Sequence, residues 1–267
     1  MTTAAGFFLA SKGSIDFGLL AVTVLGVGFV IGCACVFNNY IDRNIDKLMK
    51  RTKNRALANQ SISTFNALFF GSLLGVVGFG LLISFTNLLT VGLGVFAMLS
   101  YLAFYGMAKR HSIHGTLVGS VPGALPPVAG YTSVAGNLDI GTLLLFLALI
   151  FWQMPHFYAI ALFRIKDYKA AGIPVLPIVK GLVNTKRQML IYILLFIATL
   201  SMFVAFDYAS YIFFVVLLVV SLRWLHLVAQ GFNKSSDDTA WARKIFGFSL
   251  LVLLSFSFMI SVDSTFF

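Results

Sequence analysis

The sequence predicts an all-α polytopic membrane protein in which a single domain covers residues 1–267. The first observation is compositional: hydrophobic residues make up 59% of the chain, charged residues 10%, and the mean hydropathy is +0.94. A soluble globular domain does not have this composition. The second is that apolar stretches long enough to cross a bilayer recur along the chain. The third is that the connections between them are alternately basic and free of Lys and Arg.

Eight segments are predicted to span the membrane. They are expected to be helices, because a lipid-exposed backbone must satisfy its own hydrogen bonds, and about 20 apolar residues cross the hydrocarbon core. The eight are Gly18–Phe37, Phe65–Phe85, Leu88–Ala108, Gly115–Val134, Ile140–Phe163, Met189–Phe206, Tyr208–Val228 and Ile245–Val262. A further apolar run, Ala4–Ala10, is too short to span.

The charge difference between alternate connections sets the expected orientation. Lys and Arg follow the first, third, fifth and seventh segments, whereas the charged residues of the other connections are Asp139, Asp207 and Asp263. By the positive-inside rule, the basic connections are cytoplasmic. The net charge of +10 is therefore explained by topology in a lipid bilayer, and it does not indicate a nucleic-acid partner.

An oxygen-rich face is predicted where the first span ends. Asn38, Asp42 and Asp46 follow each other at intervals of four, so they share one face of a helix. Two carboxylates and an amide are oxygen ligands of the kind that Mg²⁺ takes together with waters and substrate phosphates. We interpret the three residues as a catalytic metal site. The alternative is a solvated helix end whose Asp side chains offset the neighbouring Lys and Arg.

The basic residues that follow complete a motif. With Arg51 and Arg55, the stretch reads NNYIDRNID…RTKNR. It resembles the first aspartate-rich motif of the UbiA superfamily of intramembrane prenyltransferases, and within that superfamily it is most similar to the branch that farnesylates haem. The resemblance covers nearly the whole chain. It implies a UbiA-like transmembrane helix bundle with eight full spans plus a truncated N-terminal one, of which Ala4–Ala10 is the last half.

Basic residues near the same cytoplasmic mouth are candidate ligands of a substrate diphosphate. Arg is the better geometric partner for phosphate, because its guanidinium group binds bidentately. The candidates are Arg51, Arg55, Lys109, Arg110, Arg164 and Lys169. Lys109 and Arg110 are explained equally well as anchors at the membrane interface.

A polar cluster interrupts the fifth span at Trp152-Gln153-Met154-Pro155-His156. A polar side chain inside a span is costly unless it faces the bundle interior and has a partner. A neutral imidazole can ligate haem iron, and the family resemblance makes His156 the candidate haem-binding residue. The alternative is a structural His that bonds to a neighbouring helix.

The connection after the fifth span holds the place of a second motif. Most of the superfamily carries a second pair of aspartates there, whereas this chain has only Asp167, followed by Tyr168, among basic residues. The sequence DYKAAGIPVLP resembles the haem-modifying branch. A mostly cationic motif would bind either diphosphate oxygens or haem propionates, and the sequence does not decide between them.

The resemblance implies an enzyme of the bacterial inner membrane whose active-site loops are cytoplasmic. Its substrates are farnesyl diphosphate and haem b, its cofactor is Mg²⁺, and contact with a haem A synthase or a terminal oxidase assembly is left open. The farnesyl group would join a vinyl group of haem b with addition of water, releasing diphosphate. Two alternatives remain: a prenyltransferase for an aromatic quinone precursor, and a haem-binding or haem-transporting membrane protein without chemistry.

Overall fold

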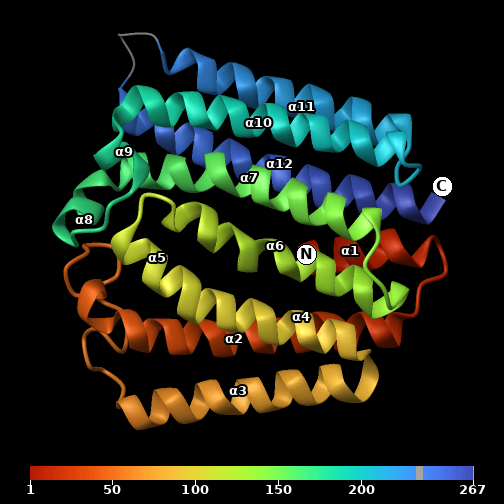
Figure 1. The fold of residues 1–267 in the computed structure, drawn as a ribbon, viewed down its shortest axis with the longest axis horizontal. Helices are drawn as coiled ribbons and strands as arrows, with labels where there is room; N and C mark the ends of the chain where they lie inside the picture. The colour runs from red at the N-terminus through yellow and green to blue at the C-terminus, as the bar shows by residue number, and fades with distance from the viewer. Residues whose placement is uncertain (233–236, 267) are drawn as a thin grey trace.

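The computed structural model describes residues 1–232 and 237–266, and in this part of the chain every regular element is a helix. The long helices lie side by side in one elongated bundle (Figure 1). The prediction of an all-α polytopic bundle is confirmed.

The elements follow one another along the chain with short connections. In order they are α1 (Thr2–Ser11), α2 (Phe17–Asp46), α3 (Thr64–Phe85), α4 (Leu88–Leu99), the π-helical segment η1 (Ser100–Tyr105), α5 (Gly106–His111), α6 (Gly115–Ala135), α7 (Ile140–Phe163), α8 (Ile165–Ala170), α9 (Leu176–Val179), α10 (Gly181–Ala205), α11 (Tyr211–Gln230) and α12 (Asp238–Phe266).

Seven of the described helical units are long and apolar enough to cross a membrane. They are α2, α3, the continuous unit from α4 to α5, α7, α10, α11 and α12. The predicted span Gly115–Val134 does form a helix, α6, but it falls outside this set, because Pro, Gly, Ser and Thr dilute its apolar residues. By length and apolar composition, seven of the eight predicted spans qualify; α6, 21 residues long, packs among them and runs between the same two ends of the bundle, with the short α1 beside it.

Helices α2 and α10 extend well beyond the ends of their predicted apolar spans. Helix α2 continues past Phe37 to Asp46, because no Gly or Pro interrupts the polar residues that follow the apolar run. Helix α10 begins at Gly181 rather than Met189, so its first two turns are polar. Hydropathy marks where a helix leaves the lipid, whereas the helix itself ends where its backbone finds other partners.

The interior is organised around α7, which packs against α6, α10 and α12. Aromatic side chains from three helices fill the space beside it: Phe196 and Phe203 of α10, Phe213 of α11 and Phe256 of α12 are fully buried and in ring contact with one another. At the other edge of the bundle, α3 packs mainly on α2 and turns exposed apolar side chains outward, as a lipid-facing helix does.

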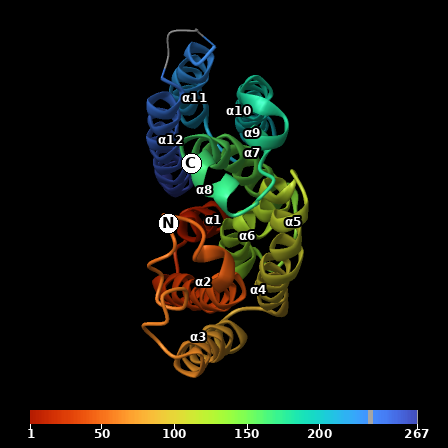
Figure 2. The ribbon, with the colours of Figure 1, turned by 90° about the vertical axis from the view of Figure 1, so that its left-hand side faces the viewer.

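Helix α1 lies inside the bundle, against α2, α6 and α12 (Figure 2). Its close approach to α6 depends on two glycines. A Cβ on Gly6 would meet the carbonyl oxygen of Pro127, and a Cβ on Gly130 would meet that of Thr3. Because backbone atoms cannot move aside as a flexible side chain can, larger residues at these positions would force the two helices apart.

The connections rich in Lys and Arg gather at one end of the bundle, beside α5, α8 and α9 (Figure 1). The connections with Asp139 and Asp207 lie at the opposite end, together with the last turn of α12, which carries Asp263. The alternating charge pattern predicts this separation. Two long helices lie between one basic connection and the next, so successive basic connections return to the same end of the bundle. Which end faces the cytoplasm stays a prediction from the positive-inside rule.

Candidate active site

The predicted oxygen-rich face lies on the last three turns of α2 and is buried. The exposed fractions of Asn38, Asp42 and Asp46 are 7%, 6% and 4%. A carboxylate buried to this extent is expensive unless a cation or several hydrogen bonds compensate it. The geometry is therefore not that of a solvated helix end.

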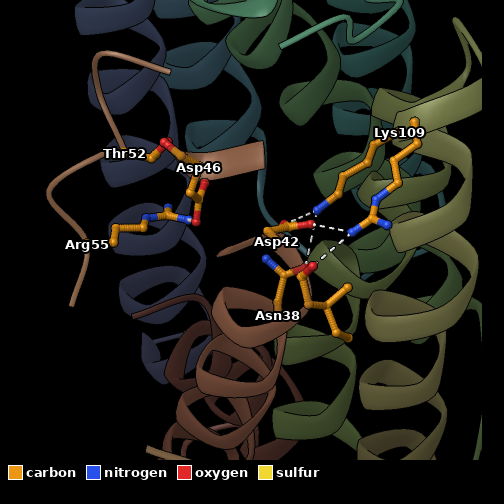
Figure 3. Close-up of polar contacts among 8 residues, drawn as sticks. Asn38, Asp42, Asp46, Thr52, Arg55 and Lys109 are labelled. Carbon is orange, nitrogen blue, oxygen red and sulfur yellow. Dashed lines mark hydrogen bonds and ion pairs between the residues drawn. The ribbon is translucent and has the colours of Figure 1, made fainter. Parts of the chain in front are cut away.

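Asp42 is compensated by two cations from α5. Lys109 donates from Nζ to Asp42 Oδ2, and Arg110 Nη2 lies 3.1 Å from Asp42 Oδ1. Lys109 Nζ also donates to Asn38 Oδ1 at 3.3 Å (Figure 3). Arg110 Nη2 is shared with the carbonyl oxygen of Ile41, at 3.1 Å. The structure thus brings Lys109 and Arg110 onto the acidic face and does not leave them as anchors at the interface.

A π-helical segment precedes these cations. In η1 the backbone bonds reach five residues back, so its side chains do not follow the angular spacing of an α-helix. The rings of Tyr101 and Tyr105 stack at 5.5 Å between centroids, and the Lys109 ammonium lies 5.1 Å from the centre of the Tyr105 ring. Single π-helical turns within α-helices occur frequently at functional sites.

Asp46 is compensated by the loop that follows α2. Arg55 Nη1 donates to Asp46 Oδ2 at 2.9 Å, and the Thr52 hydroxyl donates to the Asp46 carbonyl oxygen at 3.1 Å (Figure 3). These contacts turn the loop back over the end of the helix. Arg51 is exposed. Of the predicted diphosphate ligands in this loop, Arg55 is therefore on the acidic face, whereas Arg51 is exposed to solvent.

The second motif lies on the short helix α8. Arg164 Nη1 is 3.9 Å from Asp167 Oδ2, which has no hydrogen-bond partner among the described residues. Burial raises the pKa of the Tyr168 phenol, while the charges of Arg51 and Arg164 lower it and that of Asp167 raises it. Lys169 is exposed. These residues do not contact the acidic face of α2 within the described part of the chain.

A cavity of about 220 Å³ lies between α5, which carries Lys109, and the second motif on α8. Lys109 and Tyr105 line it from one side, Phe157 of α7 from another, and Tyr168 with Pro174 from the connection around α8. A larger cavity, of about 360 Å³, lies at the opposite end of the bundle near Lys12, Asp207 and Asp263. We place the candidate site at the smaller cavity, because Lys109, which lines it, also contacts the buried Asp42 of α2.

His156 faces α12 rather than this cavity. Its Nδ1 lies 2.7 Å from the Ser249 hydroxyl, and that hydroxyl donates to the Phe246 carbonyl oxygen at 2.6 Å. Since a hydroxyl has one proton, Ser249 must accept from His156, so the neutral imidazole carries its proton on Nδ1. Its ring also stacks on Trp152 at 4.8 Å between centroids. Ser249 is thus the partner that a structural His156 would need. Ligation of haem iron by His156 stays a prediction, and it would involve Nε2.

The donor set on α2 fits a magnesium ion. Two carboxylates and an amide oxygen are hard ligands, and such a partial set suits a cation that keeps waters and binds substrate phosphates. Among the described residues no group of three or more His, Cys, Asp or Glu side chains is close enough to hold a metal by itself. Waters and substrate phosphate oxygens would complete the coordination of a metal held by these residues.

Sequence reasoning missed the two tyrosines of η1. A signal was present, since Tyr101, Tyr105 and Lys109 are spaced by four, as Asn38, Asp42 and Asp46 are. It was not decisive, because aromatic stripes at helical spacing are common in membrane spans. Only the cavity shows that these rings face the candidate site.

Comparisons with known proteins identify the family and the fold. The model of the UbiA prenyltransferase family matches residues 1–252. The chain is 47% identical over 264 residues, 98% of its length and 87% of the relative's, to protoheme IX farnesyltransferase 2 of Chromobacterium violaceum.

Two solved structures show the same fold. A UbiA homologue from Aeropyrum pernix, solved without ligand, superposes with a TM-score of 0.79 at 16% identity and covers 98% of this chain and 97% of its own. A homologue from Archaeoglobus fulgidus, bound to GPP and Mg²⁺, superposes with a TM-score of 0.67 at 14% identity and covers 98% of this chain and 94% of its own.

Proposed function

Because the chain belongs to the UbiA prenyltransferase family, we propose that it transfers a farnesyl group from farnesyl diphosphate to a vinyl group of haem b. The observation that carries the diphosphate chemistry is the buried contact between Asn38 and Asp42 on α2 and Lys109 on α5. The choice of haem as acceptor is supported by the relative's name and by its high identity over nearly the full chain.

The reaction proceeds in three steps. The bond between C1 of the farnesyl group and the diphosphate oxygen breaks, and its electron pair leaves with the diphosphate. The π electrons of the vinyl group form the new carbon–carbon bond. Water then adds to the resulting cation and loses a proton, which leaves a hydroxyethylfarnesyl side chain. The barrier lies mainly in the charge that develops on the leaving diphosphate, so groups that stabilise this charge accelerate the reaction.

The chain provides such groups at the cytoplasmic mouth. Asn38, Asp42 and Asp46 would hold Mg²⁺, which supplies positive charge to the diphosphate oxygens. Lys109, Arg110 and Arg55 now neutralise the carboxylates, and the same groups are the donors that phosphate oxygens prefer. Arg110 has a buried Nε without a hydrogen-bond partner among the described residues, so one of its donors is available to a ligand.

The second motif supports haem over a quinone precursor as acceptor. A quinone-type prenyltransferase is expected to keep a second pair of aspartates, whereas α8 offers Asp167 among Arg164, Lys166 and Lys169. This cationic surface can bind either the diphosphate or the haem propionates. Tyr168 lines the cavity between the two motifs, so a group bound there would lie near both.

The proposed setting is the bacterial inner membrane, with the loops of the candidate site in the cytoplasm. Both substrates have apolar bodies and anionic heads, so they fit a site at the end of a helix bundle where lipid meets water. Contact with a haem A synthase or a terminal oxidase assembly stays a prediction.

The haem content of cells tests the proposal. A bacterial strain that lacks its own haem farnesylation should, when it expresses this chain, yield a haem more apolar than haem b. The matched control is the Asp42→Asn variant at equal membrane abundance, which should yield haem b alone. Unchanged haem in the presence of abundant wild-type protein would contradict the choice of acceptor.

A further inference from the structure

We propose that Lys109 is an exchangeable counter-ion. It neutralises the metal-binding oxygens of Asn38 and Asp42 until a diphosphate draws it away, so that metal and diphosphate bind together. The inference rests on the proposed function, because it takes the acidic face of α2 as the metal site. It adds a coupling between metal binding and diphosphate binding, which family membership and the relatives' names do not state.

The ammonium group of Lys109 occupies the oxygens that a metal needs. It contacts Asp42 Oδ2 and lies 3.3 Å from Asn38 Oδ1, so it contacts two of the three predicted ligands (Figure 3). A divalent cation bound through these lone pairs would be in direct repulsion with Lys109. The two cations therefore cannot share the site, and one must leave before the other binds.

Burial makes the exchange unfavourable for a metal alone. The side chains of Lys109 and Asp42 are 11% and 8% exposed, and a charge pair out of water interacts more strongly than one at the surface. Displacing Lys109 without a new partner would leave an ammonium ion unpaired in a buried place, which is costly. The wild-type site should hence bind free Mg²⁺ weakly.

A diphosphate offers Lys109 the missing partner. The Lys109 side chain lines the 220 Å³ cavity as well as the acidic face, and a lysine carries its three donors on a flexible stem. A phosphate oxygen in the cavity would accept from the same ammonium group. The Tyr105 ring, 5.1 Å away, borders both positions. Lys109 can then move from carboxylate to phosphate without passing through an unpaired state.

Arg110 is held differently. Its Nη2 bonds to the carbonyl oxygen of Ile41 as well as to Asp42, at 3.1 Å each. The backbone contact keeps the guanidinium beside α2 whatever Asp42 binds. Lys109 has no such backbone contact in the described part of the chain, so it is the one to move.

Lys186 provides a matched comparison. It is also buried, its Nζ donates to Asp238 at 2.6 Å and to the Gly231 carbonyl oxygen, and it lies 4.9 Å from the centre of the Trp241 ring. It resembles Lys109 in its own burial, in pairing with a carboxylate and in its aromatic contact, although Asp238 is 46% exposed whereas Asp42 is 8% exposed. It is not part of the lining of the cavity beside Asp42. A difference between variants of the two lysines would therefore report the position of Lys109 and not the general effect of removing a buried charge.

The experiment measures binding without turnover. Mn²⁺ binding by electron paramagnetic resonance and pyrophosphate binding by calorimetry are compared in wild type, Lys109→Met and Lys186→Met. Lys109→Met should tighten metal binding in the absence of pyrophosphate by about tenfold, within the usual range of coupling between sites, and should weaken pyrophosphate binding in the absence of metal. Lys186→Met should change neither. Metal affinity that is unchanged or lower in Lys109→Met would overturn the proposal.

A second readout needs no variant. Because coupling between two ligands is reciprocal, Mg²⁺ and pyrophosphate together should raise the melting temperature of the wild type by more than the sum of their separate effects, after correction for the complex they form in solution. Additive effects would overturn the inference.

The two proposals can fail separately. If no combination of metal and pyrophosphate binds in a way that depends on Asp42, the proposed function fails with the inference. If the pair binds and depends on Asp42, but metal alone binds Lys109→Met no better than wild type, only the counter-ion inference fails.

Discussion

Replacing Asp42 with Ala should affect both activity and stability, and the two effects can be separated. The carboxylate is the main partner of Lys109, whose ammonium would keep only the Asn38 amide oxygen at 3.3 Å and the Tyr105 ring. Removing one partner of a buried ion pair typically costs about 3–5 kcal/mol. Arg110 adds less, because its side chain is 35% exposed and remains bonded to the backbone.

A second substitution distinguishes loss of charge balance from loss of chemistry. In Asp42→Ala/Lys109→Met the unpaired ammonium is gone, so the double variant should melt at a higher temperature than Asp42→Ala in the same detergent. It should not regain activity, since removing a group that stabilises the developing charge lowers the rate by about 10²-fold or more. Thermal unfolding of such proteins is commonly irreversible, so apparent melting temperatures are compared at one scan rate.

Two results would refute this reasoning. If the double variant is no more stable than Asp42→Ala, the ammonium of Lys109 is not buried against Asp42 in the way the contacts indicate. If purified Asp42→Ala turns over farnesyl diphosphate at a rate near that of wild type, Asp42 has no part in the reaction. Asp42→Asn, which keeps the side-chain volume and one acceptor oxygen, is the control for packing.

Three further results are expected. If His156 ligates haem, His156→Ala should shift or abolish the absorbance of bound haem and leave farnesyl diphosphate binding intact, whereas loss of both together would indicate a structural role. Gly130→Leu should lower the apparent melting temperature, because overpacking costs about 1–3 kcal/mol. The control Gly80→Leu should not lower it, because a side chain at Gly80 faces open space. Equal melting temperatures of the two variants would contradict the packing of α1 on α6. Cysteines at Lys53 and Asn137 should be labelled from opposite sides of the membrane, and labelling from one side would contradict the helix order.

The acidic face was predictable because its information is local. Three residues at intervals of four lie on one face of any helix, and nothing between Asn38 and Asp46 breaks the helix that leaves the membrane. The topology was predictable for a similar reason, because hydropathy and loop charge act on each segment separately. The family motif then linked the face to a reaction.

The partners of that face were not predictable in the same way. Lys109 is 67 residues from Asp42, and its position depends on how α5 packs and on the π-helical segment before it. No residue type in SYLAFY marks a π-helix, since backbone bonds and not side chains define it. The sequence therefore left two interpretations of Lys109 and Arg110 open: diphosphate ligands or anchors at the interface. Only the packing of the helices shows that both residues contact Asp42.

The partner of His156 was also not predictable from the sequence. A His in an apolar span needs a partner whether it ligates a metal or bonds to a helix, so the residues left both interpretations open, and the family resemblance made His156 the candidate haem ligand. The contacts of His156 depend on the rotation of α7, which turns His156 to Ser249 of α12 and its neighbour Phe157 to the cavity. The hydrophobic periodicity of α7 gave no hint of this, because the helix is apolar on nearly every face.

The most direct test of the account is the product formed by the purified protein in lipid nanodiscs with haem b, farnesyl diphosphate, Mg²⁺ and isotopically labelled water. The account predicts a haem whose mass has increased by one farnesyl group and one hydroxyl, with the label in the hydroxyl and one diphosphate released for each haem converted. Unmodified haem, with the farnesyl group passed instead to a phenolic acceptor or left on its diphosphate, would contradict it.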